Sequence, residues 1–209
     1  MNRRLKKMLK LYGNKGSGSA NKVEYTLHLL NMPHDYKDMD FQKDLKTPAY
    51  LKIHPAGKIP AIDDDGFILF ESNAICRYLC DKKGSSLYPK DLKKRALVDQ
   101  WTDFTNLHVA TAMGKIAVYK VFAKMMGMIP DENSYQEGLK LMSRFMPIID
   151  EQLKKNTYLA GAELTLADIN LFAALEYADK SAYDLSGWEN VSNWRTKLMA
   201  MDFYKKSHT

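Results

Sequence analysis

GKIPA at residues 57–61 and FESNAI at residues 70–75 are the two segments from which the fold can be worked out. Pro60 has no backbone N–H, and the bond before a proline is the one peptide bond for which the cis form is readily accessible. A cis bond between Ile59 and Pro60 would turn the N–H and C=O of Ile59 outward. An extended peptide can pair with such groups in the manner of an added strand.

The second segment places an acid and a hydroxyl, Glu71 and Ser72, where a helix is predicted to begin. The first backbone N–H groups of a helix have no partner within the helix, and the positive end of the helix dipole attracts a carboxylate. Together the two segments predict a cradle for a small, peptide-like ligand that carries a carboxylate.

The bulk composition is that of an ordinary globular protein. The 209 residues are 45% hydrophobic and 27% charged, which leaves ample material for a buried core. No apolar run approaches the ~18 residues that a membrane-spanning helix needs. The basic residues at positions 1–7 are not followed by the apolar segment of a secretory signal. We therefore expect a cytoplasmic protein without a membrane partner.

The charge and the cysteines narrow the function further. The formal charge is +6, but the basic residues are scattered along the chain. This pattern favours a solvated surface that attracts an anionic small ligand, and we expect no nucleic-acid partner. Cys76 and Cys80 are spaced i, i+4 in a predicted helix. We interpret them as packing thiols in a reducing compartment, in preference to a redox or metal pair.

The composition changes near residue 82 and predicts an α/β domain followed by an all-α domain. Upstream, short β-like runs alternate with helical ones, and Asp65-Gly66 between apolar runs predicts a hairpin. The predicted strands are residues 8–12, 36–41, 61–62 and 67–70, and the predicted helices are residues 20–30, 48–52 and 72–79. A polar linker with Gly84 and Pro89 then separates a domain at 1–82 from a domain at 91–209.

The downstream part carries helical signals only. Residues 96–108 and 134–154 have apolar side chains at helical spacing, and Pro147 predicts a kink or break in the second of these helices. Thr165 and Asp168 have the spacing of an N-cap and an acid at the third helical position. No internal repeat is evident.

In this order and at these separations, the motifs resemble those of the soluble glutathione transferases. They extend over nearly the whole chain: LYG at 11–13 with Ser17, HPAGKIPA at 54–61, FESNAI at 70–75, LYP at 87–89, VDQW at 98–101 and LTLAD at 164–168. The resemblance implies a thioredoxin-like N-terminal domain that holds glutathione as co-substrate. It also implies an all-helical domain that supplies the second-substrate pocket, and a homodimer.

Among the branches of this family, the chain is most similar to serine-type enzymes of the phi or theta kind, or to related bacterial and fungal forms. Their spacing maps the catalytic serine onto Ser17, with Ser19 as a rival. Tyr12 belongs to the predicted strand, which disfavours a tyrosine-type enzyme. No cysteine precedes Cys76, which disfavours a cysteine-type enzyme. A simpler interpretation of Ser17 is a helix N-cap in a glycine-rich turn.

The resemblance also assigns the residues that bind glutathione. Ile59 would pair with the cysteinyl backbone, and Glu71 and Ser72 would anchor the γ-glutamyl end. Lys46 and Lys58 match positions where the family places basic or amide groups against the glutathione backbone and glycyl carboxylate. No metal is expected. The simpler interpretations are a plain helix start for the acid–hydroxyl pair and solvated surface for the lysines.

Other motifs are assigned mainly to structure. The acid that corresponds to Asp168 is a folding element of the helical domain in this family. The family builds its second-substrate pocket where this chain has several methionines and two aromatic residues, although helix core is the better interpretation for most of them. These residues are Met113, Met125, Met126, Met128, Tyr119 and Phe122.

The function that we predict is transfer of glutathione to an apolar electrophile, with a detoxifying role. One alternative is a non-catalytic interaction module, because GKIPA and FESNA also resemble the transferase-like domain of translation elongation factor 1 gamma. That protein carries a long C-terminal region, whereas this chain stops at Thr209. A second alternative is a carrier that binds apolar compounds without turning them over.

Overall fold

The computed structural model describes residues 7–208, which form two compact units. The first unit comprises residues 7–85 together with residues 202–208, and the second comprises Ser86–Met201. The first combines a sheet with helices and the second is all-helical. The predicted fold class, a thioredoxin-like α/β domain followed by an all-α domain, is confirmed.

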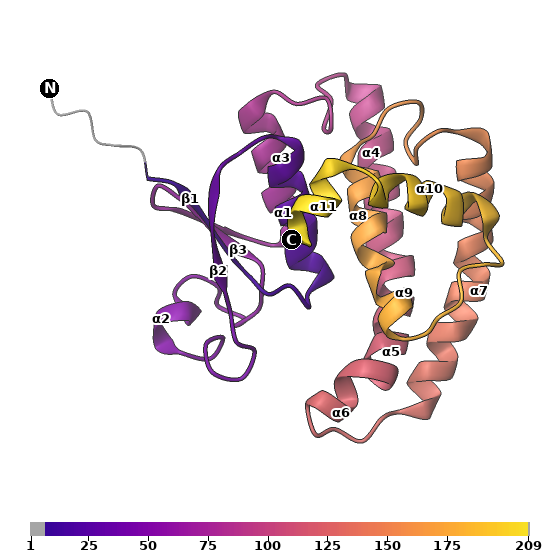
Figure 1. Cartoon of the computed structure of the whole chain (residues 1–209), viewed down its shortest axis with the longest axis horizontal. Helices are drawn as coiled ribbons and strands as arrows, with labels where there is room; N and C mark the ends of the chain where they lie inside the picture. Colours follow the sequence, from indigo (N-terminus) through magenta and orange to yellow (C-terminus); the bar gives the residue numbers. More distant parts are fainter. Residues whose placement is uncertain (1–6, 209) are drawn as a thin grey trace, which may run out of the picture. The chain divides into compact units, whose positions relative to one another are not determined.

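A four-stranded mixed sheet is the centre of the first unit (Figure 1). Its strand order is β2-β1-β3-β4. The first pair is parallel and the other two pairs are antiparallel. The strands are β1 (Leu9–Gly13), β2 (His34–Asp38), β3 (Ala61–Asp64) and β4 (Phe67–Phe70).

Strand β1 shows why the sheet is covered on both sides. Leu9 and Leu11 are buried, whereas Tyr12 is half-buried and its ring lies 5.9 Å from that of Tyr50. Successive side chains of a strand point to opposite faces. Helices α1 (Gly18–Leu29) and α3 (Ser72–Lys83) pack together on the face of Leu9 and Leu11. The short α2 (Pro48–Leu51) lies on the opposite face, that of Tyr12 (Figure 1).

The predicted hairpin is confirmed. Asp64 pairs with Phe67, so Asp65 and Gly66 are its two loop residues. Both have positive φ, 56° and 96°. The turn type whose twist matches that of the paired strands in a two-residue hairpin requires positive φ at both loop residues. The side chain of Asp63 accepts a 2.7 Å hydrogen bond from the N–H of Gly66, which further stabilises the turn.

The last helix, α11 (Asp202–Ser207), packs against α1 in the first unit. The rings of Tyr25 and Phe203 meet edge to face at 5.3 Å, and the ammonium of Lys15 donates to the C=O of Ser207 at 3.0 Å. The sequence places all residues from 91 to 209 in the helical domain, whereas this helix contributes to the core of the α/β unit.

The second unit is built on two long helical segments that pack side by side through α5 and α7. Residues 92–125 are helical throughout, with two π-helical stretches, and α7 forms the longest single helix. The fully buried side chains of the second unit include Met113, Ile116, Met142 and Phe172. The elements are α4 (Leu92–Phe104), η1 (Thr105–Ala110), α5 (Thr111–Ala117), η2 (Val118–Phe122), α6 (Ala123–Met125), α7 (Glu132–Lys155), α8 (Leu166–Ala174), α9 (Glu176–Lys180) and α10 (Glu189–Met199).

Two sequence expectations for this unit have different outcomes. The sequence predicts a kink or a break at Pro147. Helix α7 continues through this residue, so there is no break; Met146 and Ile149, on either side of it, are buried against the core. The capping box of α8 is present. Asp168 is fully buried and accepts hydrogen bonds from the N–H of Leu159, both donors of Thr165, and the indole of Trp194. It therefore serves the fold.

The cysteines lie as expected for packing residues. Cys76 and Cys80 are buried on one face of α3 and are not joined in a disulfide. Burial raises the pKa of both thiols, which keeps them protonated and unreactive. Across the described residues, no helix is both long enough and apolar enough to cross a membrane.

Candidate functional site

The sheet register brings the three predicted site segments to one end of the first unit. Tyr12, near the end of β1, pairs with Ala61 at the start of β3, and Ala61 pairs with Phe70 at the end of β4. The turn that contains Ser17 follows β1, the GKIPA segment precedes β3, and Glu71 follows β4. These segments, far apart in sequence, therefore converge at the same edge.

The bond between Ile59 and Pro60 is cis, as the sequence predicts. Within residues 7–208, neither the N–H nor the C=O of Ile59 takes part in a hydrogen bond. The preceding carbonyl, that of Lys58, accepts a 2.8 Å hydrogen bond from the hydroxyl of Tyr50. The loop is thus fixed from α2 while the peptide groups of Ile59 remain available for a ligand.

Glu71 occupies the N-cap of α3 in an unusual backbone conformation. Its φ and ψ are 71° and 108°, and its side chain makes no capping hydrogen bond. A non-glycine residue with positive φ is strained, and such residues concentrate at ligand sites. Ser72 is the first helical residue and is half-buried. The N–H groups at the start of α3 are therefore left without a side-chain cap, as binding of a carboxylate would need.

Lys22 is a site residue that the sequence analysis missed. It extends from α1 to donate a 2.5 Å hydrogen bond to the side-chain oxygen of Asn73 in the first turn of α3. It is only 6% exposed, and burial lowers its pKa to about 8. The charge of Glu71 acts on it in the opposite sense. A cation is thus held at the first turn of α3, next in sequence to the acid–hydroxyl pair.

His54 was also missed as a site residue. Its ring lies 4.7 Å from that of Phe70, and its buried Nδ1 makes no hydrogen bond within residues 7–208. Burial lowers the pKa of this imidazole, and the charges of Glu71 and Lys58 both act on it. It therefore lies between the GKIPA segment and the start of α3 as a neutral ring.

Lys46 and Lys58 flank the turn that precedes the cis bond. Both are exposed. Gly57 between them has φ +57°, and a Cβ built there would lie 3.2 Å from the Lys46 ammonium. The Lys46 ammonium therefore lies next to the segment that carries Lys58 and Ile59, which places two exposed lysines there. This arrangement suits a ligand with more than one carboxylate.

Ser17 and Ser19 differ clearly in their surroundings. Ser17 is the N-cap of α1, is 9% exposed, and its oxygen accepts the N–H of Ala20 at 3.4 Å. Since the oxygen accepts, the hydroxyl proton is available to donate. Ser19 lies in the first turn of α1 and is exposed. Both interpretations of Ser17, helix cap and hydrogen-bond donor to a ligand, are therefore compatible with its geometry.

The methionines assigned to the second-substrate region fall into two groups. Met113 is fully buried in the core of the second unit, whereas Met125, Met126 and Met128 are exposed by half or more. The expectation that most of them form helix core is therefore wrong. Helix α6 ends at Met125, so Met126 and Met128 lie beyond it and are not part of a helix that could bury one of its faces. Tyr119 stacks on Tyr135 at 4.5 Å.

Comparisons with known proteins agree with this architecture. Residues 16–82 match the family model of the glutathione S-transferase N-terminal domain, and residues 112–202 match that of the C-terminal domain. A probable glutathione S-transferase, GSTF2 of Oryza sativa subsp. japonica, is 32% identical over 197 residues, which is 92% of each chain. The solved structure of glutathione transferase F2 from Populus trichocarpa superposes with a TM-score of 0.88 at 28% identity, covering 96% of this chain and 97% of that one.

A relative of another class is also similar. The probable elongation factor 1-gamma 1 of Arabidopsis thaliana is 34% identical over 165 residues. That match covers 77% of this chain but only 38% of the elongation factor. It is thus confined to one part of a longer protein, whereas the matches to transferases extend over nearly the full length of both chains.

Proposed function

The chain belongs to the glutathione S-transferase family, and we propose that it conjugates glutathione to apolar electrophiles. The observation that carries this proposal is the convergence of the Ser17 turn, the cis Ile59–Pro60 bond and the start of α3 at one edge of the sheet. A peptide thiol bound there would meet a backbone pairing site, a carboxylate site and a hydroxyl donor.

Each part of glutathione has a partner in this proposal. The cysteinyl backbone pairs with the N–H and C=O of Ile59. The γ-glutamyl end binds at Glu71 and Ser72, its ammonium against the acid and its carboxylate at the first N–H groups of α3. Lys46 and Lys58 attract the glycyl carboxylate. Lys22 donates to Asn73 and thereby positions the first turn of α3.

The chemical step needs the thiolate of glutathione, because the thiol is a poor nucleophile. The hydroxyl of Ser17 donates to the sulfur, and the positive end of α1 adds to the stabilisation of the anion. A hydrogen bond to a charged group is worth about 1.5–3 kcal/mol, equivalent to about one to two pKa units. The thiolate then attacks the electrophilic carbon, a carbon–sulfur bond forms, and the leaving group departs with the bonding electrons.

The broader setting follows from the same family. We propose that the enzyme acts in the cytoplasm as a homodimer and that its conjugates serve detoxification. The second unit would supply the surface for the electrophile, and the exposed methionines near α6 suit a site of variable shape, because thioethers adapt to irregular ligands.

One experiment separates the enzyme from its two alternatives. The full chain is passed over immobilised glutathione, and the retained protein is then assayed for conjugation of a generic aryl halide. Retention followed by conjugation at a rate well above the uncatalysed reaction supports the transferase. Retention without turnover indicates a carrier, and neither property indicates an interaction module like that of the elongation factor.

A further inference from the structure

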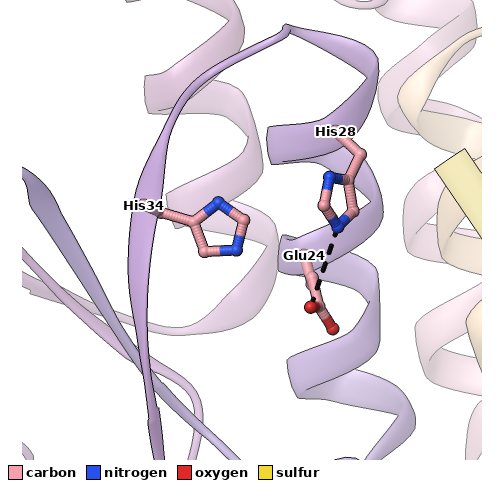
Figure 2. Close-up of side chains that lie close together, drawn as sticks. All are labelled: Glu24, His28 and His34. Atoms are coloured by element: carbon pink, nitrogen blue, oxygen red, sulfur yellow. Dashed lines mark ion pairs between the residues drawn. The ribbon is translucent and has the colours of Figure 1, made fainter. Parts of the chain in front are cut away.

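Glu24, His28 and His34 form a cluster in the first unit, in the second half of α1 and at the start of β2 (Figure 2). One ligand atom from each lies within 4.8 Å of the other two. Glu24 and His28 are one turn apart on α1, and His34 is the first residue of β2. At a rise of 1.5 Å per residue, His28 is about 16 Å along the helix from Ser17. The proposed glutathione chemistry does not use any of the three.

The backbone between the two histidines is fixed. Asn31 has φ 48°, its N–H donates to the C=O of His28, and the N–H of Met32 donates to the C=O of Leu27 at 2.9 Å. This pair of hydrogen bonds is the Schellman arrangement that closes a helix end. Since His34 then enters the sheet, both imidazoles are attached to rigid elements that point them toward each other.

The hydrogen bonding of the imidazoles leaves one nitrogen of each for a metal. The Nδ1 of His34 lies 3.2 Å from the C=O of Met32, so it donates its proton there and Nε2 carries the lone pair. A second partner of this kind is what orients histidine ligands in metal sites. The Nε2 of His28 is buried and makes no hydrogen bond within residues 7–208. It faces the carboxylate of Glu24 at 3.7 Å.

The distances are close to those of a tetrahedral site. Ligand atoms that lie 2.0–2.1 Å from a zinc ion are roughly 3.3–3.4 Å apart. The 3.7 Å between His28 and Glu24 is near this value, and the separations of up to 4.8 Å within the cluster close by about 1.4 Å of side-chain movement. A hollow of about 400 Å³ is lined by His28 and His34, which leaves room for a water molecule as the fourth ligand.

We propose that Glu24, His28 and His34 form a binding site for a divalent transition metal of the Zn²⁺ class. Two neutral imidazoles and one carboxylate match the ligand preference of such ions. Bound there, the ion would join the C-terminal end of α1 to the start of β2 and stabilise the first unit. This proposal does not depend on the proposed transferase function.

Two lysines place positive charge at the proposed metal site, which disfavours binding of a cation. The ammonium of Lys15 lies 2.6 and 2.8 Å from the two oxygens of Glu24, and Lys206 lines the same hollow. The Lys15 side chain is 52% exposed and also donates to the C=O of Ser207, so it can move from the carboxylate toward solvent. Its charge competes with the metal, and removal of that charge should strengthen binding.

The test is a zinc titration of the full chain after removal of metals by a chelator, in the absence of glutathione, which itself binds zinc. We expect one equivalent of Zn²⁺ per chain and a rise in melting temperature that a chelator reverses. H28Q and H34Q should each weaken binding at least tenfold, whereas H208Q, which changes an exposed histidine outside the cluster, should bind as the wild type does. Circular dichroism establishes that each variant is folded.

Two further measurements keep the proposal falsifiable if a histidine variant folds poorly. K15M should bind zinc several-fold more tightly, and unchanged affinity would exclude Glu24 as a ligand. Co²⁺ in place of Zn²⁺ should give the visible bands of a tetrahedral site with nitrogen and oxygen ligands. A thiolate charge-transfer band would instead locate the metal at the cysteines and overturn the proposal, as would equal zinc binding by the wild type and an H28Q/H34Q double variant.

Discussion

Lys22 donates a 2.5 Å hydrogen bond to the side chain of Asn73, which joins α1 to the second residue of α3. The ammonium is almost entirely buried, and burial lowers its pKa to about 8 from an ordinary value of 10.5. A buried charge destabilises a fold unless its partners compensate. Burial of the charged lysine therefore lowers the stability of the fold, while its hydrogen bond to Asn73 fixes the first turn of α3.

The stability of the protein should consequently depend on pH through Lys22. Below about pH 8 the lysine is charged in both the folded and unfolded states, and the full cost of burying it applies. Between about pH 8 and 10.5 the folded state has lost a proton that the unfolded state keeps, so the contribution of this group to stability rises with pH. Relative to K22M, the wild type should gain on the order of 1–3 kcal/mol across this range.

Urea denaturation of both proteins from pH 7 to pH 10 measures this difference. K93M, which replaces an exposed lysine, is the control and should follow the wild type at every pH. If the unfolding free energy of the wild type minus that of K22M stayed constant or fell as the pH rises, the assignment would be contradicted.

Ser17 and Ser19 can be separated by substitution. S17A removes both the proposed donor to the thiolate and the cap of α1. We expect turnover to fall by roughly 10- to 100-fold, from the loss of about 1.5–3 kcal/mol, with little change in glutathione affinity. S19A should leave turnover unchanged. The measurement is steady-state conjugation with glutathione and an aryl halide.

S17D distinguishes the two roles of the residue. Aspartate is a good N-cap, so S17D should retain the melting temperature of the wild type, whereas S17A should lose about 1 kcal/mol of stability. Neither variant has a hydroxyl proton to donate. If S17D turned over as fast as the wild type, Ser17 would be a helix cap only.

Tyr50 should act on glutathione binding through the carbonyl of Lys58, to which it donates at 2.8 Å. Y50F removes this hydrogen bond and frees the segment before the cis bond. We expect a KM for glutathione several-fold higher, a kcat within twofold of wild type, and a loss of about 0.5–1.5 kcal/mol in stability. A change confined to kcat would place Tyr50 in the chemical step instead.

The local features of the chain could be predicted from the sequence because short-range chemistry determines them. The hairpin at Asp65-Gly66 requires two residues that adopt positive φ, and the cap of α8 requires Thr165 and Asp168 at a fixed spacing. The cis bond at Pro60 is likewise a property of one dipeptide. Each of these was located correctly.

Features that depend on tertiary packing were not predicted. Strand β2 reads HDYKD and has no apolar alternation; it is an edge strand whose position is set by parallel pairing with β1. The predicted strand at residues 36–41 therefore began two residues late. The burial of Lys22 depends on the packing of α1 against α3, and a lysine in a sequence gives no sign of it. The approach of His34 to His28 similarly depends on where β2 begins.

Gly57 offers the sharpest test of the loop that presents Ile59. It has φ +57°, and a Cβ there would lie 2.6 Å from the C=O of Leu45. Gly84 has a similar φ of +65°, but nothing lies within 4 Å of its Cβ position, so G84A carries only the backbone cost of about 1 kcal/mol. G57A carries that cost and a collision with backbone, for which we expect a total of about 2–4 kcal/mol.

Urea denaturation of the two variants isolates the collision, because both replace a glycine of positive φ by alanine. G57A should also weaken glutathione binding several-fold, since relief of the contact with Leu45 must shift the residues just before the cis bond. G84A, at the end of α3, should bind glutathione as the wild type does. Equal losses of stability in the two variants would mean that the loop relaxes freely, and that its backbone is not what holds Ile59 in place.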